Sequence, residues 1–268
     1  MLIRSFRIVA ASVSILLYAA TAAAQQTASR AEKVQNAGEL RVCIWPDYYS
    51  ISYRNPRTGA LEGIDIAMAR HLAGDLGVAV RFVDSSFRTL IDDLLNDRCD
   101  VSMHGVGVTA ARREKLAFSA PVLRGGIYAI ASKRHPSIRS WGDIDREGVI
   151  VVAQAGTYME PVMRETLKKA ELMVVHSPEA RELEVMSGRA DVFVTDYPYS
   201  RKMLAIHDWA ALLVPPQPLA PAPYAYAVAP GDDKWLALLD AFVARAKRDG
   251  RLAQAAADAG LSAIVVLD

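Results

Sequence analysis

The chain has 268 residues, of which 52% are hydrophobic, and its 31 lysine and arginine residues nearly balance its 30 aspartate and glutamate residues. This length suffices for one large domain or two ordinary ones with a substantial core, and the composition excludes a disordered chain. The near-neutral charge argues against a general nucleic-acid binder, and two cysteines exclude a disulfide-stapled miniprotein and a four-cysteine zinc site.

Residues 1–24 have the pattern of a secretory signal. Arg4 and Arg7 precede an apolar run over residues 8–18, and the alanines that follow fit a cleavage site. The apolar run is too short to span a bilayer, and no cysteine stands beside the cleavage point to carry a lipid. The pattern therefore predicts an exported protein without a lipid anchor, in which polar residues 25–37 form a flexible N-terminal segment.

From Leu40 onward, strands and helices alternate along the chain. Residues 63–77 carry apolar side chains at helical spacing, with Asp65 as a plausible N-cap, and residues 78–84 alternate as a strand does. The first set of predicted elements comprises strands at 40–45, 78–84 and 99–105 and helices at 63–77 and 87–98. Strands that alternate with helices in this way imply a parallel sheet with right-handed crossovers.

A second set of elements follows, and then a proline-rich connector. The predicted strands are 126–132, 148–154, 170–177 and 190–196, and the predicted helices are 157–170, 177–190 and 197–207. Five prolines within residues 214–223 indicate an extended segment. It leads to a further strand at 224–230 and two helices at 232–250 and 251–260.

These two sets predict an α/β fold with two lobes, each a mostly parallel sheet flanked by helices. Lobe 1 comprises residues 38–123 and 223–268, and lobe 2 comprises residues 124–222 with the connecting segments. Ligands of open α/β sheets bind beyond the carboxyl ends of the strands, so we expect a cleft between the lobes that closes by a hinge motion.

Cys43 and Cys99 lie beside predicted strands of the first set. An oxidising compartment permits a disulfide between them, and neighbouring parallel strands bring them near each other. The register of these strands, however, is offset by several residues. We therefore favour two buried thiols, packed as small hydrophobic side chains.

Several short motifs recur in a specific order along the chain. They are GELRV at 38–42, GIDI at 63–66, Asp100, Thr109 with Arg112, FSAP at 118–121, AGT at 155–157, GRAD at 188–191, Thr195 with Asp196, and RDG at 248–250. This order resembles the type II periplasmic solute-binding proteins, specifically the polar amino-acid-binding family of ABC importers. The resemblance implies a monomeric periplasmic protein with no cofactor and no metal. It implies binding of an amino acid or derivative, for delivery to ABC permease subunits.

The resemblance also implies a pair of charged residues for a zwitterionic ligand. Arg112 stands where relatives bind the ligand α-carboxylate, and a planar guanidinium gives a carboxylate two charge-assisted hydrogen bonds. Asp196 stands where relatives hold the α-ammonium group. An aspartate at the end of a strand is equally a common N-cap, so both roles stay open for Asp196.

Four further residues are expected near the ligand. Gly105 and Gly107 follow a predicted strand, and glycine suits a backbone that passes close to a ligand, although relatives commonly carry a hydroxyl where Gly107 stands. Thr157 lies at a helix start, where free amides favour an anion, and it is also a plausible N-cap. Tyr158 replaces a small hydroxylated residue of relatives and predicts a narrower or aromatic pocket.

Aromatic residues suggest how the ligand side chain is held. Relatives place rings at the positions of Tyr48 and Phe87 to sandwich the ligand, although an aromatic cluster here equally fits packing within the lobe. Trp45 stands where relatives selective for basic side chains tend to have an acid. This argues against a lysine-type or arginine-type ligand.

The chain carries no nucleophile elbow, P-loop, zinc-ligand pair or dinucleotide motif, so we expect a binder and no enzyme. One enzyme class on this fold stays open, because residues 119–126 are similar to those of cyclohexadienyl (arogenate/prephenate) dehydratases. These enzymes carry a glutamate three residues after the aspartate, where this chain has Tyr199, and a phenol with a pKa near ~10 is a poor general acid. An accessory binding protein of a periplasmic redox system is the third alternative.

Overall fold

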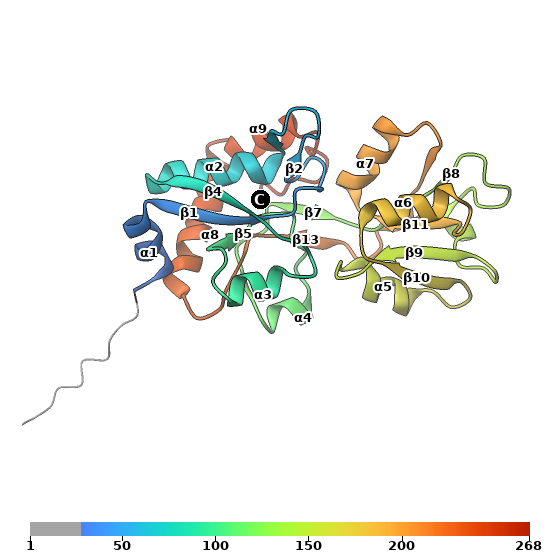
Figure 1. Ribbon diagram of the computed structural model, residues 1–268, viewed down its shortest axis with the longest axis horizontal. Coiled ribbons are helices and arrows are strands. Elements are labelled where there is room, and N and C mark those ends of the chain that lie inside the picture. Colours follow the sequence, from blue (N-terminus) through green and yellow to red (C-terminus); the bar gives the residue numbers. More distant parts are fainter. Residues whose placement is uncertain (1–27) are drawn as a thin grey trace, which may run out of the picture.

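The computed structural model describes residues 28–268, so the signal predicted at 1–24 lies outside the described residues. The two-lobed α/β fold is confirmed: two lobes lie side by side along the long axis, each with its own five-stranded sheet (Figure 1). Within residues 28–268, no helix has both the length and the apolarity needed to cross a bilayer.

Helix α1 (Arg30–Ala37) occupies much of the segment that the sequence predicts to be flexible at 25–37, so that prediction is wrong from residue 30 onward. The Ser29 hydroxyl accepts a hydrogen bond from the Glu32 amide, and the Glu32 carboxylate accepts one from the Ser29 amide. This reciprocal cap satisfies two backbone donors that would otherwise lack partners. Val34 is only 1% exposed, so burial of its side chain fixes an otherwise polar helix on lobe 1.

The sheet of lobe 1 has the strand order β4–β1–β5–β14–β6. Its strands are β1 (Glu39–Ile44), β4 (Ala79–Asp84), β5 (Val101–Ser102), β6 (Ala117–Phe118) and β14 (Ala227–Val228). The strands β4, β1 and β5 are parallel, whereas β14 is antiparallel to β5 and β6. The other elements here are α2 (Ile64–Leu76), α3 (Leu90–Leu95), α4 (Ala110–Arg113), α8 (Asp233–Arg248), α9 (Arg251–Asp258) and the hairpin of β2 (Tyr53–Arg54) and β3 (Leu61–Glu62).

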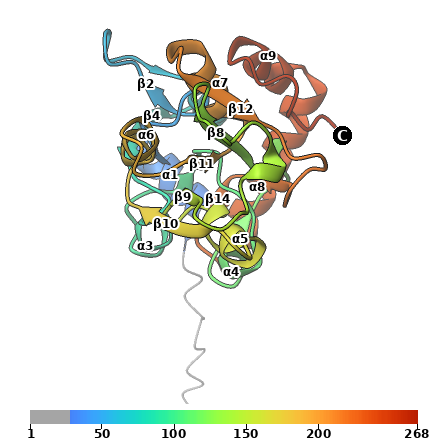
Figure 2. The same cartoon turned by 90° about the vertical axis from the view of Figure 1, so that its right-hand side faces the viewer.

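The sheet of lobe 2 has the order β10–β9–β11–β8–β12. Its strands are β8 (Tyr128–Ser132), β9 (Ile150–Gln154), β10 (Glu171–Val175), β11 (Val192–Thr195) and β12 (Ala210–Leu213). The helices between these strands are η1 (Trp141–Asp143), α5 (Met159–Thr166), α6 (Pro178–Met186) and α7 (Tyr197–Ile206). Val151 and Val152 belong to different hydrophobic clusters, the first with residues of α5 and the second with residues of α6. Since neighbouring strand residues point to opposite faces, α5 and α6 cover opposite faces of the sheet (Figure 2).

In each five-stranded sheet, two of the four strand pairings are antiparallel, so the sheets are mixed where the sequence predicts mostly parallel ones. The antiparallel strands arise where the chain crosses between lobes. Strands β7 (Leu123–Gly125) and β13 (Ala222–Tyr224) pair with each other on this crossing. The second passage, β13, returns the proline-rich connector to lobe 1, so β14 enters its sheet in the reverse direction.

Cys43 and Cys99 form a disulfide, and the prediction of two separate thiols is wrong. The strand register pairs Cys43 with Ser102, three residues beyond Cys99. Because β5 begins only at Val101, the strand register does not hold Cys99, and its Cα lies 5.6 Å from that of Cys43. The bridge therefore fastens the chain segment after α3 to β1, an interior strand of the sheet.

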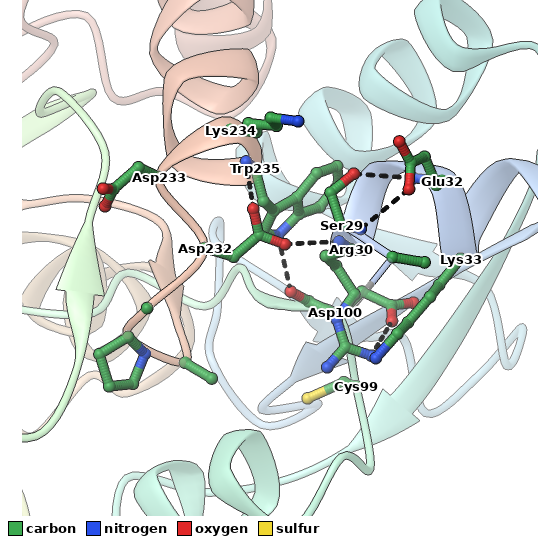
Figure 3. Close-up of a pocket in the computed structure, with 14 residues that line it drawn as sticks. Ser29, Arg30, Glu32, Lys33, Cys99, Asp100, Asp232, Asp233, Lys234 and Trp235 are labelled. Atoms are coloured by element: carbon green, nitrogen blue, oxygen red, sulfur yellow. Dashed lines mark hydrogen bonds and ion pairs between the residues drawn. The ribbon is translucent and has the colours of Figure 1, made fainter. Parts of the chain in front are cut away.

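A cavity of about 620 Å³ lies beside α1 and the start of α8, in lobe 1 (Figure 3). The Arg30 guanidinium pairs with the carboxylates of Asp97 and Asp100. The Trp235 indole N–H donates to the Asp100 carbonyl at 3.0 Å, and the Trp235 amide donates to Asp232 at 2.9 Å. Because these groups bond to one another and join α1 to α8, we assign this cavity a structural role.

Candidate functional site

A small cavity lies between the two lobes, where the sequence predicts a cleft. Its lining residues are Trp45, Tyr48 and Phe87 of lobe 1, and Gln154, Thr157, Met159, Arg181, Thr195, Asp196 and Tyr199 of lobe 2. Its volume is about 10 Å³, the room of about one water molecule. A more open groove of about 460 Å³ adjoins it, with Arg112, Thr157 and Tyr158 in its wall.

Arg112 lies on α4, whose N-cap is Thr109, and its side chain is buried at the boundary between the lobes. Its Nη1 donates to the Gly107 carbonyl at 2.7 Å, and its Nη2 donates to the Gly156 carbonyl of lobe 2 at 3.0 Å. Among the described residues, no carboxylate lies within 4.0 Å of this guanidinium. Burial lowers the pKa of Arg112 to about 10, which still leaves it a cation at neutral pH.

Asp196 follows β11, and both of its carboxylate oxygens accept hydrogen bonds. Its Oδ1 accepts the Tyr199 amide at 3.1 Å, so the carboxylate caps α7. Its Oδ2 accepts hydrogen bonds from the hydroxyls of Tyr48 and Tyr224, the latter at 3.2 Å, and Asp196 belongs to the wall of the interlobe cavity. Burial raises the pKa of Asp196, because removal from water disfavours the charged form.

The two predicted glycines accommodate aromatic rings. A Cβ at Gly105 would lie 2.8 Å from Cε1 of Tyr48, and the φ of Gly105 is +63°. A Cβ at Gly107 would lie 3.2 Å from Cδ1 of Tyr158, so a serine or threonine here would press on that ring. The absence of a Cβ at Gly105 and Gly107 therefore leaves room for the rings of Tyr48 and Tyr158. Neither glycine lines the cavity between the lobes.

Thr157 lines the cavity, but the prediction that it caps a helix is wrong. Helix α5 begins at Met159, its N-cap is Tyr158, and the Thr157 hydroxyl donates to the Gln154 carbonyl at 2.8 Å. The backbone amides that the sequence predicts to bind an anion already donate hydrogen bonds within the protein. That of Gly156 donates to Glu160 at 3.3 Å, and that of Thr157 donates to Gln154 at 3.4 Å.

Aromatic side chains form the lobe 1 wall of the cavity. Phe87 meets Trp45 with ring centroids 5.2 Å apart and Tyr48 with centroids 5.7 Å apart, both edge to face. Tyr158 meets Tyr224 edge to face, with ring centroids 6.3 Å apart. Its side chain forms part of the wall of the adjoining groove. Tyr48, Phe87 and Tyr158 thus stand at the boundary between the lobes, where a side chain of a bound solute would meet rings on edge and on face.

Two buried titratable groups lie behind this wall. The His104 Nδ1 lies 3.0 Å from the Ser102 hydroxyl and 3.4 Å from the Cys43 carbonyl, and burial lowers the pKa of His104 to about 4. His104 is therefore neutral at physiological pH. Within residues 28–268, no group of three or more His, Cys, Asp and Glu side chains is arranged to hold a metal ion.

Asp65 is the second buried group, and it does not cap α2 as the sequence suggests. The N-cap of α2 is Gly63, while the Asp65 Oδ2 accepts the Gly105 amide at 2.7 Å. Its Oδ1 and the hydroxyl of nearby Tyr226 are buried without a hydrogen-bond partner among the described residues. Burial raises the pKa of Asp65 to about 7.

This raised pKa gives a testable pH dependence. Above the ordinary aspartate pKa of 3.8, the unfolded carboxyl ionises while the native one keeps its proton, so unfolding releases a proton and is favoured as pH rises. We expect the unfolding free energy of the parent, relative to Asp65→Asn, to fall between about pH 4 and pH 7 by up to about 1.4 kcal/mol per pH unit, and then to level off.

Denaturant unfolding across this pH range measures the difference. Asp75→Asn is the control, because hydrogen bonds from Arg251 lower the pKa of Asp75. The stability that the ionised Asp75 contributes is therefore lost only as the pH falls below the ordinary aspartate pKa. A flat difference for Asp65→Asn across the range would show that Asp65 is ionised in the native protein.

The sequence reasoning missed Arg181, Gln154, Thr195 and Met159 in the cavity wall and Tyr224 on Asp196. Arg181 precedes Val185 by one helical turn, so it lies on the buried face of α6. The four-residue spacing between Arg181 and Val185 is the sequence pattern that indicates which face of the helix Arg181 occupies. Tyr224 lies on β13, where the proline-rich connector crosses back to lobe 1, and no residue pattern indicates that its hydroxyl meets Asp196 of lobe 2.

Comparisons with known proteins place this geometry among solute-binding folds. The family profile described as bacterial extracellular solute-binding proteins, family 3, matches residues 40–258. The chain is 30% identical over 252 residues to a cyclohexadienyl dehydratase of Pseudomonas aeruginosa, covering 94% of this chain and 93% of the relative. It is 26% identical to the L-cystine-binding protein TcyJ of Escherichia coli, over 61% of each chain.

A solved structure has the same architecture. The crystal structure of the ancestral amino acid-binding protein AncCDT-1, a precursor of cyclohexadienyl dehydratase, superposes with a TM-score of 0.77 at 29% sequence identity. The match covers 85% of this chain and 98% of the ancestral protein.

Proposed function

We propose that this chain, which belongs to the bacterial extracellular solute-binding proteins of family 3, binds an amino acid or a close derivative between its lobes and delivers it to an ABC importer. The observation that carries the proposal is the placement of one buried guanidinium and one buried carboxylate at the boundary between the lobes. Arg112 comes from lobe 1 and Asp196 from lobe 2.

The chemistry of this pair suits a zwitterion. A ligand carboxylate would replace the carbonyl acceptors of Arg112 with a charge, and charge-assisted bonds are roughly twice as strong as neutral ones. A ligand ammonium would compensate the buried charge of Asp196. Each end of the ligand thus belongs to a different lobe, so a bound solute favours the closed arrangement.

Binding of an amino acid requires the lobes to part, because the cavity between them has room for only about one water molecule. The contacts that would break include Arg112 to Gly156 and the tyrosine hydroxyls to Asp196. Strands β7 and β13 cross between the lobes as a pair and are the natural hinge.

The proposed function also requires export of the chain and contact with a transporter. Residues 1–24 serve as a cleavable signal that exports the chain to the periplasm, without a lipid anchor. The protein works there as a monomer, and its partners are the permease subunits of the importer.

A dehydratase activity is the second candidate, because a 30% identical relative carries that name. Tyr199 stands where the resemblance requires the acid. Its hydroxyl donates to Glu182, and burial raises its pKa further, which makes it a weaker acid than a free phenol. We therefore assign no dehydratase activity, and conversion of prephenate to phenylpyruvate by the purified protein, followed by absorbance, would reverse that assignment.

Thermal unfolding with added amino acids tests binding. A solute at about 100 times its Kd stabilises the native state by about 2.7 kcal/mol, which raises the Tm by roughly 5 to 10 °C. For the solute found, we expect Asp196→Asn to weaken binding at least about tenfold, because the ammonium loses its anion. The matched 2-keto acid lacks the ammonium and is the control ligand. No shift with any amino acid or derivative would contradict the proposal.

A further inference from the structure

Arg181 is a second buried guanidinium in the interlobe cavity. It lies on α6, is 2% exposed and belongs to the cavity wall. Its Nη1 donates to the Val194 carbonyl at 2.9 Å, and its Cζ lies 4.7 Å from the Tyr199 ring centroid. Its Nε is buried without a hydrogen-bond partner, and no carboxylate among residues 28–268 comes within 4.0 Å of it.

Two further polar atoms in the same wall also lack partners. They are the Gln154 Oε1 at the end of β9 and the Thr195 hydroxyl at the end of β11. Buried polar groups in folded proteins nearly always have partners, and each group left without one costs stability. The Arg181 Nε and the Thr195 hydroxyl can donate to an anionic group, whereas the Gln154 Oε1 accepts and needs a donor. A bound molecule that carries both an anionic group and a hydrogen-bond donor would supply the missing bonds.

The charges around the cavity give the sign of that molecule. In the cavity wall, Arg181 is the only basic residue and Asp196 the only acidic one, and His104 behind the wall is neutral. The adjoining groove adds Arg112. Its other charged residues lie toward solvent, where Glu160 pairs with Arg164 at 3.0 Å and Glu165 is exposed. The neighbouring Glu182 accepts the Tyr199 hydroxyl and lies 3.5 Å from Lys202 and 3.4 Å from His207, so its charge is offset elsewhere. A zwitterion without a charged side chain would compensate Arg112 and Asp196 and leave Arg181 unpaired.

We propose that Arg181, assisted by the Thr195 hydroxyl, binds a second anionic group, so that the solute is a small dicarboxylate of the glutamate or aspartate class. The inference rests on the proposed function and adds the class of its ligand. One carboxylate goes to Arg112 and the other to Arg181, and an α-ammonium, where present, goes to Asp196.

Isothermal titration of the full exported protein with L-glutamate and L-aspartate, and with their neutral isosteres L-glutamine and L-asparagine, tests this assignment. We expect the acidic member of one pair to bind at least about 30-fold more tightly than its amide, because truncating one partner of a buried charge pair costs that much or more. Arg181→Gln is expected to weaken that acidic solute about 30-fold and to leave its amide within about threefold.

Arg189→Gln is the matched control, because Arg189 lies just beyond α6, is exposed and pairs with Glu184 at 2.7 Å. It is expected to change neither affinity. Succinate and 2-oxoglutarate separate a general dicarboxylate site from one that requires the ammonium.

The wild-type preference alone is decisive, so the test does not depend on the folding of a variant. Equal or tighter binding of a neutral or basic amino acid would overturn the assignment of Arg181 and leave the proposed function standing. An equal effect of Arg181→Gln on the acidic solute and its amide would do the same. If no amino acid and no dicarboxylate binds, both proposals fail.

Discussion

Replacing Arg112 by alanine is expected to weaken the binding of every solute with an α-carboxylate by at least about 30-fold. The guanidinium is buried and donates only to the carbonyls of Gly107 and Gly156. It has no anionic partner among the described residues, and a ligand carboxylate would supply one. Without Arg112, that carboxylate would enter a closed cleft with no cation to compensate it. Titration calorimetry on the identified solute measures the loss.

Arg113→Ala is the matched control, because Arg113 is the next residue on α4 but is exposed. It is expected to leave the affinity within about threefold, since exposed charges contribute little. Unchanged unfolding of both variants would establish that the fold is intact. Retained affinity in Arg112→Ala would remove this residue from the site and would leave the carboxylate without an identified partner.

Removal of the Cys43–Cys99 disulfide is expected to destabilise lobe 1 strongly. The bridge spans 56 residues of sequence, and closing a loop of this size restricts the unfolded chain by about 4 kcal/mol. In a chain of this length, that corresponds to a fall in Tm of roughly 8 to 16 °C. Scanning calorimetry of the double variant Cys43→Ala, Cys99→Ala measures it.

The control is the wild-type protein unfolded with and without a thiol reductant. Reduction should lower the wild-type Tm toward that of the double variant and leave the double variant unchanged. A wild-type Tm that does not respond to reduction, together with two thiols free to alkylation in the native protein, would contradict the bridge.

Most of the fold follows from local patterns in the sequence. The alternation of helical and strand periods gives the two α/β sets, and five prolines in residues 214–223 give the connector that returns to lobe 1. The direction of β14 could not follow from such patterns, because strand direction depends on where a returning chain enters a sheet. The disulfide was missed for a related reason, since it depends on where β5 begins, and element ends are the least certain part of a prediction.

The cleft residues divide in the same way. Arg112 and Asp196 stand out because their motifs mark them, and the structure places both at the lobe boundary. Arg181 has no motif, and an arginine on an amphipathic helix is usually solvated. Its burial depends on β9 and β11 lying under α6, which is a tertiary contact.

The hydrogen bonds from Tyr48 and Tyr224 to Asp196 have a consequence for which solutes the protein ignores. An arriving group does not meet a bare carboxylate; it must exchange with phenol donors that already serve it. A neutral hydroxyl gains nothing by such an exchange, whereas a charged ammonium forms a stronger bond than the one it displaces. If Asp196 binds the solute as proposed, the hydroxyls of Tyr48 and Tyr224 would compete with those of sugars and polyols for its carboxylate and would disfavour these solutes without a steric barrier.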